Sequence, residues 1–427
     1  MAKPIDVTIV GGGMITSDQI LPSVYHLQRQ NVVKNISICS LNTKPLRELI
    51  KNRILKESFP DQKFVLFPSL KESKEVSFPN LYKDVIDSMD PCQVVIVAVP
   101  DQFHYQIVMD ALNFNQHVIC VKPLSLTYRQ TAEIKKTAYH KGLFVGVEYH
   151  KRFDKRHLLA RKNYRSGLYG EFVLGEAKLI EPYAYRFSNF QNWFTSDQTD
   201  PFIYIGCHYV DIVFFITGLR PVEVSSVGKK GKFTNGNEAY FWTSTRIRYE
   251  NGALLSLING LGYPDEAAGA AQQSLNMYFE RVNGSGLIEH NDQYRGILEC
   301  SIKQAHSTKA KFRFVNPDFF NLVPWEGPGY RPVGYGFDSI SALIHTIGKI
   351  NHEAESLTKS SALRRRQDMI QEIDSIGLLA TPANNFCIDL VIEAARISIQ
   401  RNGYQVFIEY GEKPRVRLNR EDGIKNH

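Results

Sequence analysis

The sequence predicts an α/β fold in which a doubly wound parallel sheet is followed by an α/β domain with an open, largely antiparallel sheet. Within the first 150 residues, short buried strands alternate with helices. From about Gly170, strand-like runs follow one another with fewer helices between them. Alternation is typical of parallel sheets covered by helices, whereas consecutive strands are typical of antiparallel sheets. We therefore expect a first domain at residues 1–150 and a second at 151–427.

The elements of the first domain follow from apolar runs of strand length and from longer segments between them. Strands are expected at Ile5–Val10, Asn35–Cys39, Val94–Val99, His117–Val121 and Leu143–Val147. The connecting segments are long enough for crossover helices, such as Tyr105–Leu112 and Tyr128–His140. This order of elements predicts that the strands lie parallel.

Three consecutive glycines, Gly11 to Gly13, follow the first strand and precede a helix that begins near Ile20. In that context Gly11 permits a tight turn, and Gly13 lets the backbone approach a pyrophosphate at the positive end of the helix. The third glycine of the G-x-G-x-x-G pattern is absent, because Thr16 occupies its position. The glycines alone therefore fit either a dinucleotide loop or a plain turn.

The second domain is expected to combine strands with a few helices. Strand-like runs are VEVSSVG, AYFWTSTRIRYE, ALLSLING and LNMYFERV, and helices are expected near 154–166, 207–217, 340–350 and 386–402. Asn251-Gly252 stands between two of these strands and is a strong hairpin-turn signal. We therefore expect an antiparallel or mixed sheet here.

Composition excludes several classes of protein. With 427 residues, 43% hydrophobic and 22% charged, the chain can bury a large core. The net charge of +7 is modest, and the basic run Arg364–Arg366 lacks interleaved aromatics, so no nucleic-acid partner is expected. No apolar stretch reaches the roughly 18 residues of a membrane helix. The N-terminus runs into a strand without a signal-peptide pattern, so we expect a cytoplasmic protein.

The cysteines also bear on the class of protein. The chain has six, at positions 39, 92, 120, 207, 300 and 387, without C-x-x-C pairs. This scatter favours reduced thiols, and no structural metal site is expected. Cys207, His208 and Asp211 are too crowded to match a common ligand pattern.

Four stretches together resemble the family of glucose-fructose oxidoreductase, inositol dehydrogenase and MocA (Gfo/Idh/MocA). They are VVIVAVPDQFHYQIVMDALNFNQHVICVKPLSLTYRQ, GVEYHKRFDKRHLLARKNYRSGLYGEF, YIGCHYVDIVFFITG and IDLVIEAARISIQRNGYQV, in the family's order. The resemblance spans nearly the whole chain, with extra length between about 262 and 335. It implies a Rossmann domain, an oligomerising α/β domain and a homodimer or homotetramer. It also implies NAD(P)-dependent oxidation or reduction of a sugar, polyol or cyclitol.

The resemblance assigns catalytic roles to Lys122 and His208. Lys122 follows a buried strand at its carboxyl end, where its ammonium can steady an alkoxide or shuttle a proton. A glutamate usually precedes this lysine in the family, and here Val121 replaces it. His208 lies three residues before Asp211, which can orient the imidazole from the same helix face. Tyr204 replaces the family's usual aspartate, which favours His208 as base and Tyr204 as a hydrogen-bond donor to substrate.

Binding residues are expected at the ends of several strands. Arg152 and Asp211 are expected to bind substrate. The residues expected to bind the cofactor are Gly11, Gly13, Met14, Ile15, Ser40, Asn42, Lys44, Pro100, His104 and Lys122. Between Ser40 and Arg47 the chain offers donors and cations and no acid, which favours the 2′-phosphate of NADP, although Asn42 also fits NAD.

Three functions remain open at this point. The first is an NAD(P)-dependent dehydrogenase of a sugar, polyol or cyclitol. The second is a redox-neutral glycosidase or lyase that uses transient oxidation by a tightly bound NAD(P), as some relatives in the family do. The third is a nonenzymatic NADP sensor, which the presence of both Lys122 and His208 disfavours.

Overall fold

A computed structural model of the chain describes residues 3–267, 269, 271–291, 297–301, 311–315 and 318–418. The chain divides into two compact units. The first consists of Met1–Ser125, Arg129–Asp154 and Asp318–Asn385, and the second of Leu126–Tyr128, Lys155–Pro317 and Phe386–His427. The first unit thus includes a late segment that lies far beyond the predicted boundary at residue 150.

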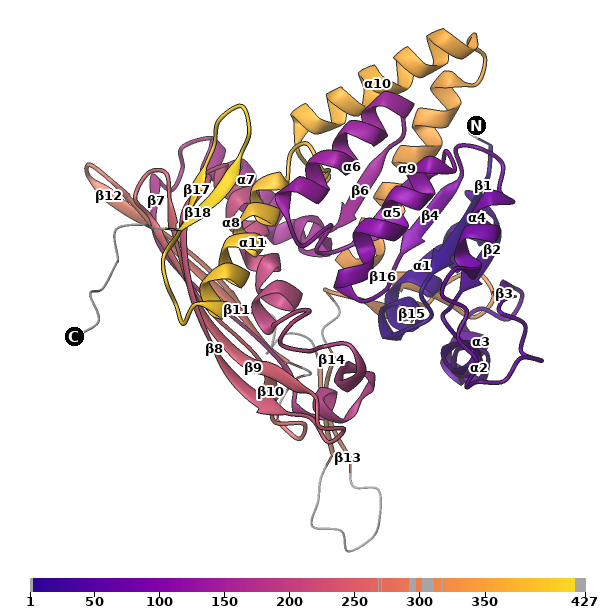
Figure 1. Cartoon of the computed structure of the whole chain (residues 1–427), viewed down its shortest axis with the longest axis horizontal. Coiled ribbons are helices and arrows are strands. Elements are labelled where there is room, and N and C mark those ends of the chain that lie inside the picture. The colour runs from indigo at the N-terminus through magenta and orange to yellow at the C-terminus, as the bar shows by residue number, and fades with distance from the viewer. Residues whose placement is uncertain are drawn as a thin grey trace, which may run out of the picture. The chain divides into compact units, whose positions relative to one another are not determined.

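A parallel sheet with strand order β3-β2-β1-β4-β5-β6 forms the centre of the first unit (Figure 1). Its strands are β1 (Ile5–Val10), β2 (Val33–Cys39), β3 (Val65–Phe67), β4 (Val94–Val97), β5 (His117–Val121) and β6 (Val145–Glu148). The five predicted strands are confirmed, with ends that differ by at most two residues. Sequence analysis missed β3, which has three residues, none of them fully buried.

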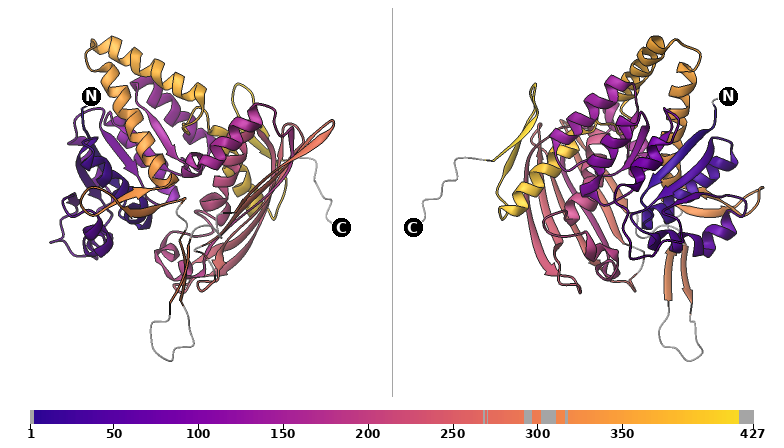
Figure 2. Two further views of the ribbon diagram at one scale, coloured as in Figure 1. Left: turned by 180° about the vertical axis from the view of Figure 1, so that it is seen from behind. Right: turned by 45° about the vertical axis from the view of Figure 1, so that its right-hand side comes forward.

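Helices cover both faces of this sheet (Figure 2). They are α1 (Leu21–Arg29), α2 (Thr43–Lys51), α3 (Arg53–Ser58), α4 (Leu81–Asp87), α5 (His104–Asn113), α6 (Tyr128–Lys141), α9 (Tyr335–Ala354) and α10 (Lys359–Ile376). Short turns of π or 3-10 helix lie at Thr16–Ile20, Asp101–Phe103 and His150–Phe153. Isoleucines of α9, such as Ile340 and Ile347, are fully buried in the same core as β1, β2 and β4. This burial explains why the late segment belongs to the first unit.

Part of the extra segment near 262–335 also packs within the first unit. Toward the C-terminal end of this segment, β15 (Asn321–Pro324) and β16 (Tyr330–Val333) form a hairpin. Arg29 of α1 donates from Nη1 to the carbonyl of Tyr330 at 2.6 Å, and its guanidinium lies over Trp325 at 5.5 Å. The hairpin is therefore attached to α1.

The second unit is built on a mixed sheet with order β12-β11-β7-β10-β9-β8-β17-β18. Its strands are β7 (Glu171–Pro182), β8 (Pro221–Lys232), β9 (Glu238–Tyr249), β10 (Leu254–Tyr263), β11 (Gln272–Arg281), β12 (Gly284–Asn291), β17 (Val406–Glu409) and β18 (Arg415–Leu418). A separate pair is formed by β13 (Ile297–Ser301) and β14 (Lys311–Val315). Only the β7–β10 pair in the large sheet is parallel, so the predicted open, largely antiparallel sheet is confirmed.

Three helices lie on one face of this sheet (Figure 1). They are α7 (Lys155–Arg165), α8 (Cys207–Thr217) and α11 (Phe386–Gln400), and short helical turns lie at Tyr183–Phe187, Asn189–Asn192 and Phe202–Gly206. The predicted hairpin at Asn251-Gly252 joins β9 to β10, with Gly252 at φ +88°. Of the cysteines, the five with described side chains are free thiols, and the side chain of Cys300 lies outside the described residues. Among the described helices, none is both long and apolar enough to cross a membrane.

His117 shows how a buried polar group is satisfied at the amino edge of the first sheet. Its Nδ1 accepts from the Phe144 amide at 2.8 Å, and its Nε2 lies 2.9 Å from Oδ1 of Asn351 on α9. Both bonds require the neutral ring with a proton on Nε2. Burial, aided by Arg366, lowers the pKa of His117 to about 4, despite the bond to Asn351.

We predict that protonation of His117 destabilises the fold. Because the folded pKa lies below the ordinary value of about 6.5, the unfolded chain binds the proton first, and stability falls as the pH drops from about 6.5 to 4. The full loss is about 3 kcal/mol. Urea unfolding between pH 7.5 and 4.5 measures it, and His117→Asn should show a shallower fall. Equal slopes for the two proteins would contradict this account.

Candidate functional site

The glycine turn after β1 lets its backbone lie close to neighbouring groups. Gly11 has φ +116°, and a Cβ there would lie 2.0 Å from the carbonyl oxygen of Ala98. Only glycine fits this position, because β1 and the end of β4 lie side by side there. A Cβ on Gly13 would meet no atom within 4 Å, so its backbone borders open space. This is the arrangement that a pyrophosphate requires at the start of a helix.

Thr16 explains how the turn works without a third glycine. Its hydroxyl donates to the Gly11 carbonyl at 2.8 Å, and the side chain is fully buried. The helix begins with a π turn at Thr16–Ile20, before α1. A π turn is wider than an α turn, which gives room for the threonine, and such turns are common at functional sites. The two predicted neighbours Met14 and Ile15 lie at the helix start, exposed and half-buried respectively.

The end of β2 presents polar groups beside this turn. Ser40 is buried, with its Oγ 3.5 Å from the Cβ position of Gly12. Asn42 caps α2, since its Oδ1 accepts from the Lys44 amide at 3.0 Å. The cap uses the oxygen of the Asn42 amide, which leaves its NH₂ donor to meet a ligand. Lys44 is exposed and lies next to this cap in the chain. Cys39, the last residue of β2, is buried, and burial raises the pKa of its thiol to about 12.

His104 connects two loops at the carboxyl edge of the sheet. The ring is fully buried, with Nδ1 2.6 Å from the Pro123 carbonyl and Nε2 2.8 Å from the Val99 carbonyl. It thereby ties the end of β4, near half-buried Pro100, to the turn after β5. Both ring nitrogens are engaged with backbone oxygens, so within this unit His104 positions the loops. A direct contact of His104 with cofactor stays a prediction.

Lys122 lies where the sequence places it, directly after β5. It is half-buried and stands at the carboxyl edge of the sheet, between the ends of β4 and β6. Register pairs Val121 with Glu148, the last residue of β6. The carboxylate that the family carries before this lysine is absent, but another carboxylate lies one strand away on the same face.

Sequence analysis missed Glu148 and its partners. Glu148 is 3% exposed, and its Oε1 accepts from Gln19 Nε2 at 2.9 Å and from Ser339 Oγ at 2.6 Å. Its Oε2 lies 3.2 Å from Nδ1 of His150. The only signal was a charged residue at the end of an apolar strand, two residues before a histidine. This cluster joins the π turn, β6, the His150–Phe153 turn and α9.

Arg152 is buried within the first unit. Its Nη2 donates to Oδ1 of Asn385 at 2.8 Å, and its guanidinium lies 6.0 Å from the centre of the Tyr149 ring. These contacts hold the Arg152 side chain in place within the first unit. Its role in substrate binding stays a prediction.

Tyr204, His208 and Asp211 belong to the second unit. Tyr204 lies in a π turn, Phe202–Gly206, that leads into α8, and its half-buried ring meets those of Phe190, Trp193 and Phe194 at 5.2 to 5.9 Å. His208 and Asp211 are buried on one side of α8, three residues apart.

A close contact fixes the start of α8 in the second unit. A Cβ on Gly206 would lie 2.5 Å from Oδ1 of Asn259 on β10, so the glycine allows the helix to approach the sheet. The structure thus groups Tyr204 with His208 and Asp211, and groups Lys122 with the glycine turn in the other unit. Joint action of the two groups is a proposal.

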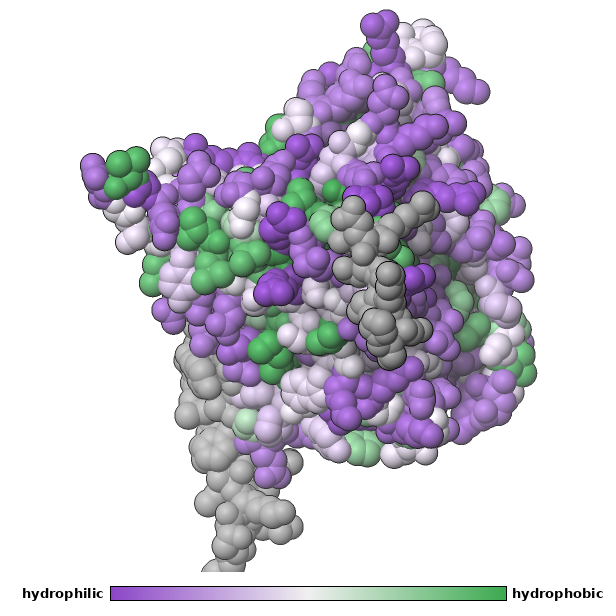
Figure 3. Space-filling model, turned by 60° about the vertical axis from the view of Figure 1, so that its left-hand side comes forward, coloured by the Kyte–Doolittle hydropathy of each residue, from purple (hydrophilic) through white to green (hydrophobic). Residues whose placement is uncertain are grey.

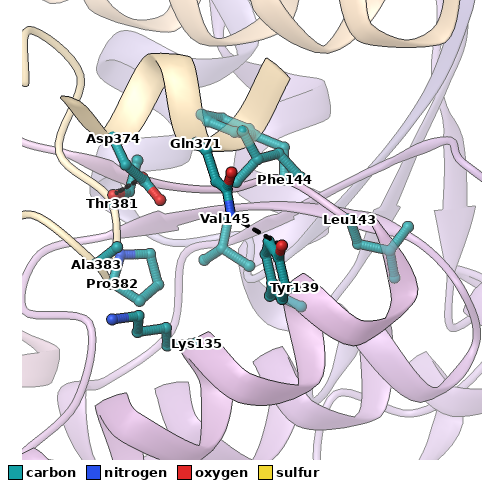
Figure 4. A pocket seen from close by; sticks show the side chains of 12 residues that line it. Lys135, Tyr139, Leu143, Phe144, Val145, Gln371, Asp374, Thr381, Pro382 and Ala383 are labelled. Carbon is teal, nitrogen blue, oxygen red and sulfur yellow. Dashed lines mark hydrogen bonds between the residues drawn. The ribbon is translucent and has the colours of Figure 1, made fainter. Parts of the chain in front are cut away.

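Two cavities in the described part of the first unit lie away from these groups. One, of about 280 Å³, is lined by α6, the start of β6, α10 and the loop after it (Figure 4). There Gln371 donates to the Tyr139 hydroxyl at 2.8 Å, and Thr381 donates to Asp374, whose pKa is raised by burial. The other, of about 310 Å³, borders Ile5 at the start of β1. The second lies at the amino edge of the sheet, opposite the glycine turn, whereas the first lies along the edge strand β6.

Comparison with known families agrees with this geometry. Residues 5–149 match the oxidoreductase family with an NAD-binding Rossmann fold, and residues 157–281 match the GFO/IDH/MocA C-terminal domain. The chain therefore belongs to the Gfo/Idh/MocA oxidoreductase family, as its sequence motifs indicated.

Individual relatives match this chain over only part of its sequence. An uncharacterised oxidoreductase of Schizosaccharomyces pombe is 30% identical over 34% of this chain and 41% of its own length. D-glucoside 3-dehydrogenase of Escherichia coli is 24% identical over 52% of this chain and 56% of its own length. The matched stretches thus span less than two thirds of these relatives. Myo-inositol 2-dehydrogenase of Lactobacillus plantarum has a similar fold, with a TM-score of 0.61 at 17% identity over 95% of this chain and 100% of that one.

The two glycines of the turn should respond differently to the same substitution. We predict that Gly11→Ala lowers the free energy of unfolding by roughly 2 kcal/mol or more, because the methyl group meets backbone at a strained φ. Gly13→Ala should change stability by no more than about 0.5 kcal/mol. It should nevertheless weaken NADP or NAD binding by about tenfold, since the methyl group enters the open space. Calorimetric titration and urea unfolding of both variants measure this, and unchanged binding in Gly13→Ala would contradict a phosphate role.

Proposed function

We propose that this protein is an NAD(P)-dependent dehydrogenase that oxidises a secondary alcohol of a sugar, polyol or cyclitol. The observation that carries the proposal is the glycine turn, whose open backbone lies at the same edge of one parallel sheet as Lys122. The names of the relatives, which act on a glucoside and an inositol, support this substrate class. The bound cofactor supplies the hydride acceptor.

Lys122 is the group proposed to stabilise the alkoxide. Its position at the end of β5 is fixed by pairing with β4 and β6 and by the turn that His104 holds. An ammonium held in place needs little reorganisation when negative charge develops on the substrate oxygen. It can also share the hydroxyl proton.

His208 is the proposed base, with Tyr204 as a donor to substrate. Asp211 lies on the same side of α8 and is suited to orient the imidazole or to bind a substrate hydroxyl. The rings around Tyr204 belong to a hydrophobic core cluster of the second unit, which restrains the orientation of the tyrosine. Arg152 remains a proposed contact to substrate oxygen.

The redox-neutral alternative uses the same residues. Transient oxidation next to a scissile bond would need the same alkoxide stabilisation and the same base, and would return the hydride to the product. Tyr204 in place of the family's aspartate is the observation that keeps this alternative in view. Product that forms without net change in NAD(P)H absorbance would favour it.

We further propose that the second unit forms a homodimer or homotetramer through its sheet. Tyr278 pairs in register with Leu174 and Leu287, and these three side chains are 44%, 46% and 53% exposed. Paired residues project from the same face, so they form an exposed apolar row across three strands. Figure 3 shows patches of hydrophobic residues among hydrophilic ones on one face of the molecule.

The central prediction concerns Lys122→Met. Because an electrostatic group is lost while the cofactor loop is intact, kcat should fall by about 100-fold or more. NAD(P) binding should change by no more than a few-fold. A panel of polyols and glycosides, scored for both NAD(P)H absorbance and product, selects the substrate for this assay.

Lys141→Met is the matched control, since Lys141 contacts Asn113 and Asn115 near the opposite edge of the sheet. It should retain full kcat. A wild-type protein that neither turns over nor forms product with any member of the panel would overturn the proposed function. Retained kcat in Lys122→Met would remove the lysine from the mechanism.

We predict a preference for NADP, because the ribose position at the end of β2 offers Ser40, the amide of Asn42 and Lys44. Asn42→Asp should reverse this preference, since the new carboxylate repels a 2′-phosphate and accepts from a 2′-hydroxyl. The helix cap survives, because aspartate also accepts from the Lys44 amide. Dissociation constants for both cofactors test this, and tenfold tighter binding of NAD by the wild type would contradict it.

A further inference from the structure

We propose that His150, held by Glu148, carries the proton released from the substrate hydroxyl to solvent. This inference rests on the proposed dehydrogenase function and adds a residue to it. The established family assignment gives no role to either position, and neither was a sequence-predicted site residue. The proposal starts from the place of the pair in the sheet.

Register brings the pair to the same edge as Lys122. Val121 lies opposite Glu148 on the neighbouring strand, so Lys122 and the His150–Phe153 turn leave the sheet side by side. His150 itself has 13% of its side chain exposed, whereas Glu148 has 3%. The imidazole thus stands between a buried carboxylate and the surface.

The contacts of the carboxylate hold the imidazole in one orientation. Gln19 and Ser339 donate to Oε1 of Glu148, which directs Oε2 to Nδ1 of His150. A carboxylate only accepts, so Nδ1 is the donor, and Nε2 is the ring nitrogen that gains and loses a proton.

Two aromatic rings restrain the imidazole as well. The Tyr335 ring stacks on it at 5.7 Å and 24°, and the Phe319 ring lies 5.0 Å away. Titratable groups near the ring in the described part of the chain include Glu148 on β6 and Tyr335 on α9, with Lys151 over the Tyr335 ring and Asp318 next to Phe319 in the chain.

The step balances without another reactant. Oxidation breaks the O–H bond and the C–H bond of the carbinol, and the C–H electron pair leaves as hydride to NAD(P)⁺. The remaining proton is taken up by the base and passes through Lys122 or water to Nε2 of His150 and then to bulk water. Glu148 acts as a positioning residue, because its carboxylate holds the imidazole and stabilises the transient imidazolium.

The test uses chemical rescue, which a structural role would not produce. In His150→Asn, kcat should fall about 10-fold to 100-fold at neutral pH, and added imidazole or a small amine should restore it by carrying the proton. Glu148→Gln should shift the pH profile of kcat, and Ser339→Ala, which removes one bond to Glu148, should shift it less. Cofactor dissociation constants, measured without turnover, should stay within a few-fold in all three variants.

His117→Asn is the matched control, because it makes the same substitution at a buried histidine of the opposite edge. It should lower stability without changing the pH profile of kcat or creating any rescue. Retained kcat in His150→Asn, or a loss that imidazole does not restore, would overturn the relay. A wild type that is inactive on the whole panel would overturn both the proposed function and the relay. An active wild type with either of the preceding results in His150→Asn would overturn the relay alone.

Discussion

Parallel pairing of β1, β4, β5 and β6 is the constraint on which the candidate site depends. Parallel strands end at one common edge, so Gly11 after β1, Lys122 after β5 and Glu148 at the end of β6 are brought together although they are far apart in sequence. The pairing also decides which faces these residues share. A shift of β6 by one residue would turn Glu148 away from Val121 and from Gln19 and Ser339. The chemistry proposed for Lys122 and His150 therefore depends on backbone register before it depends on side chains.

The first residues of two helices carry differences between this chain and the family pattern. Two helices that lead from candidate residues open with a π turn, at Thr16–Ile20 and at Phe202–Gly206. In the first, the wider turn accepts Thr16 in place of a glycine and leaves Gln19 facing Glu148. In the second, it carries Tyr204 before His208. Two departures from the expected sequence pattern, Thr16 and Tyr204, thus lie where the helices depart from regular α geometry, whereas the third, Val121, lies at the end of β5.

Much of the fold was predictable because its signals are local. Buried apolar runs such as Ile5–Val10 and His117–Val121 determine their strands with their own residues, and Asn251-Gly252 determines its hairpin. The association of Asp318–Asn385 with the first sheet was not predictable, since it depends on packing across the chain. Lys122 and His208 were found by their place in an ordered series of motifs. Glu148 was missed because its partners Gln19 and Ser339 lie 129 and 191 residues away, and no pattern links them.

Transfer of deuterium is the measurement that tests the account most directly. A substrate from the panel, labelled with deuterium at the carbinol carbon, is turned over by the wild type, and NAD(P)H and product are analysed by mass spectrometry. The account predicts that the deuterium is recovered in NAD(P)H, one atom for each ketone formed, because Lys122 and its neighbours assist the removal of a hydride. Deuterium retained in the product, with no net formation of NAD(P)H, would contradict a dehydrogenase and indicate the redox-neutral reaction.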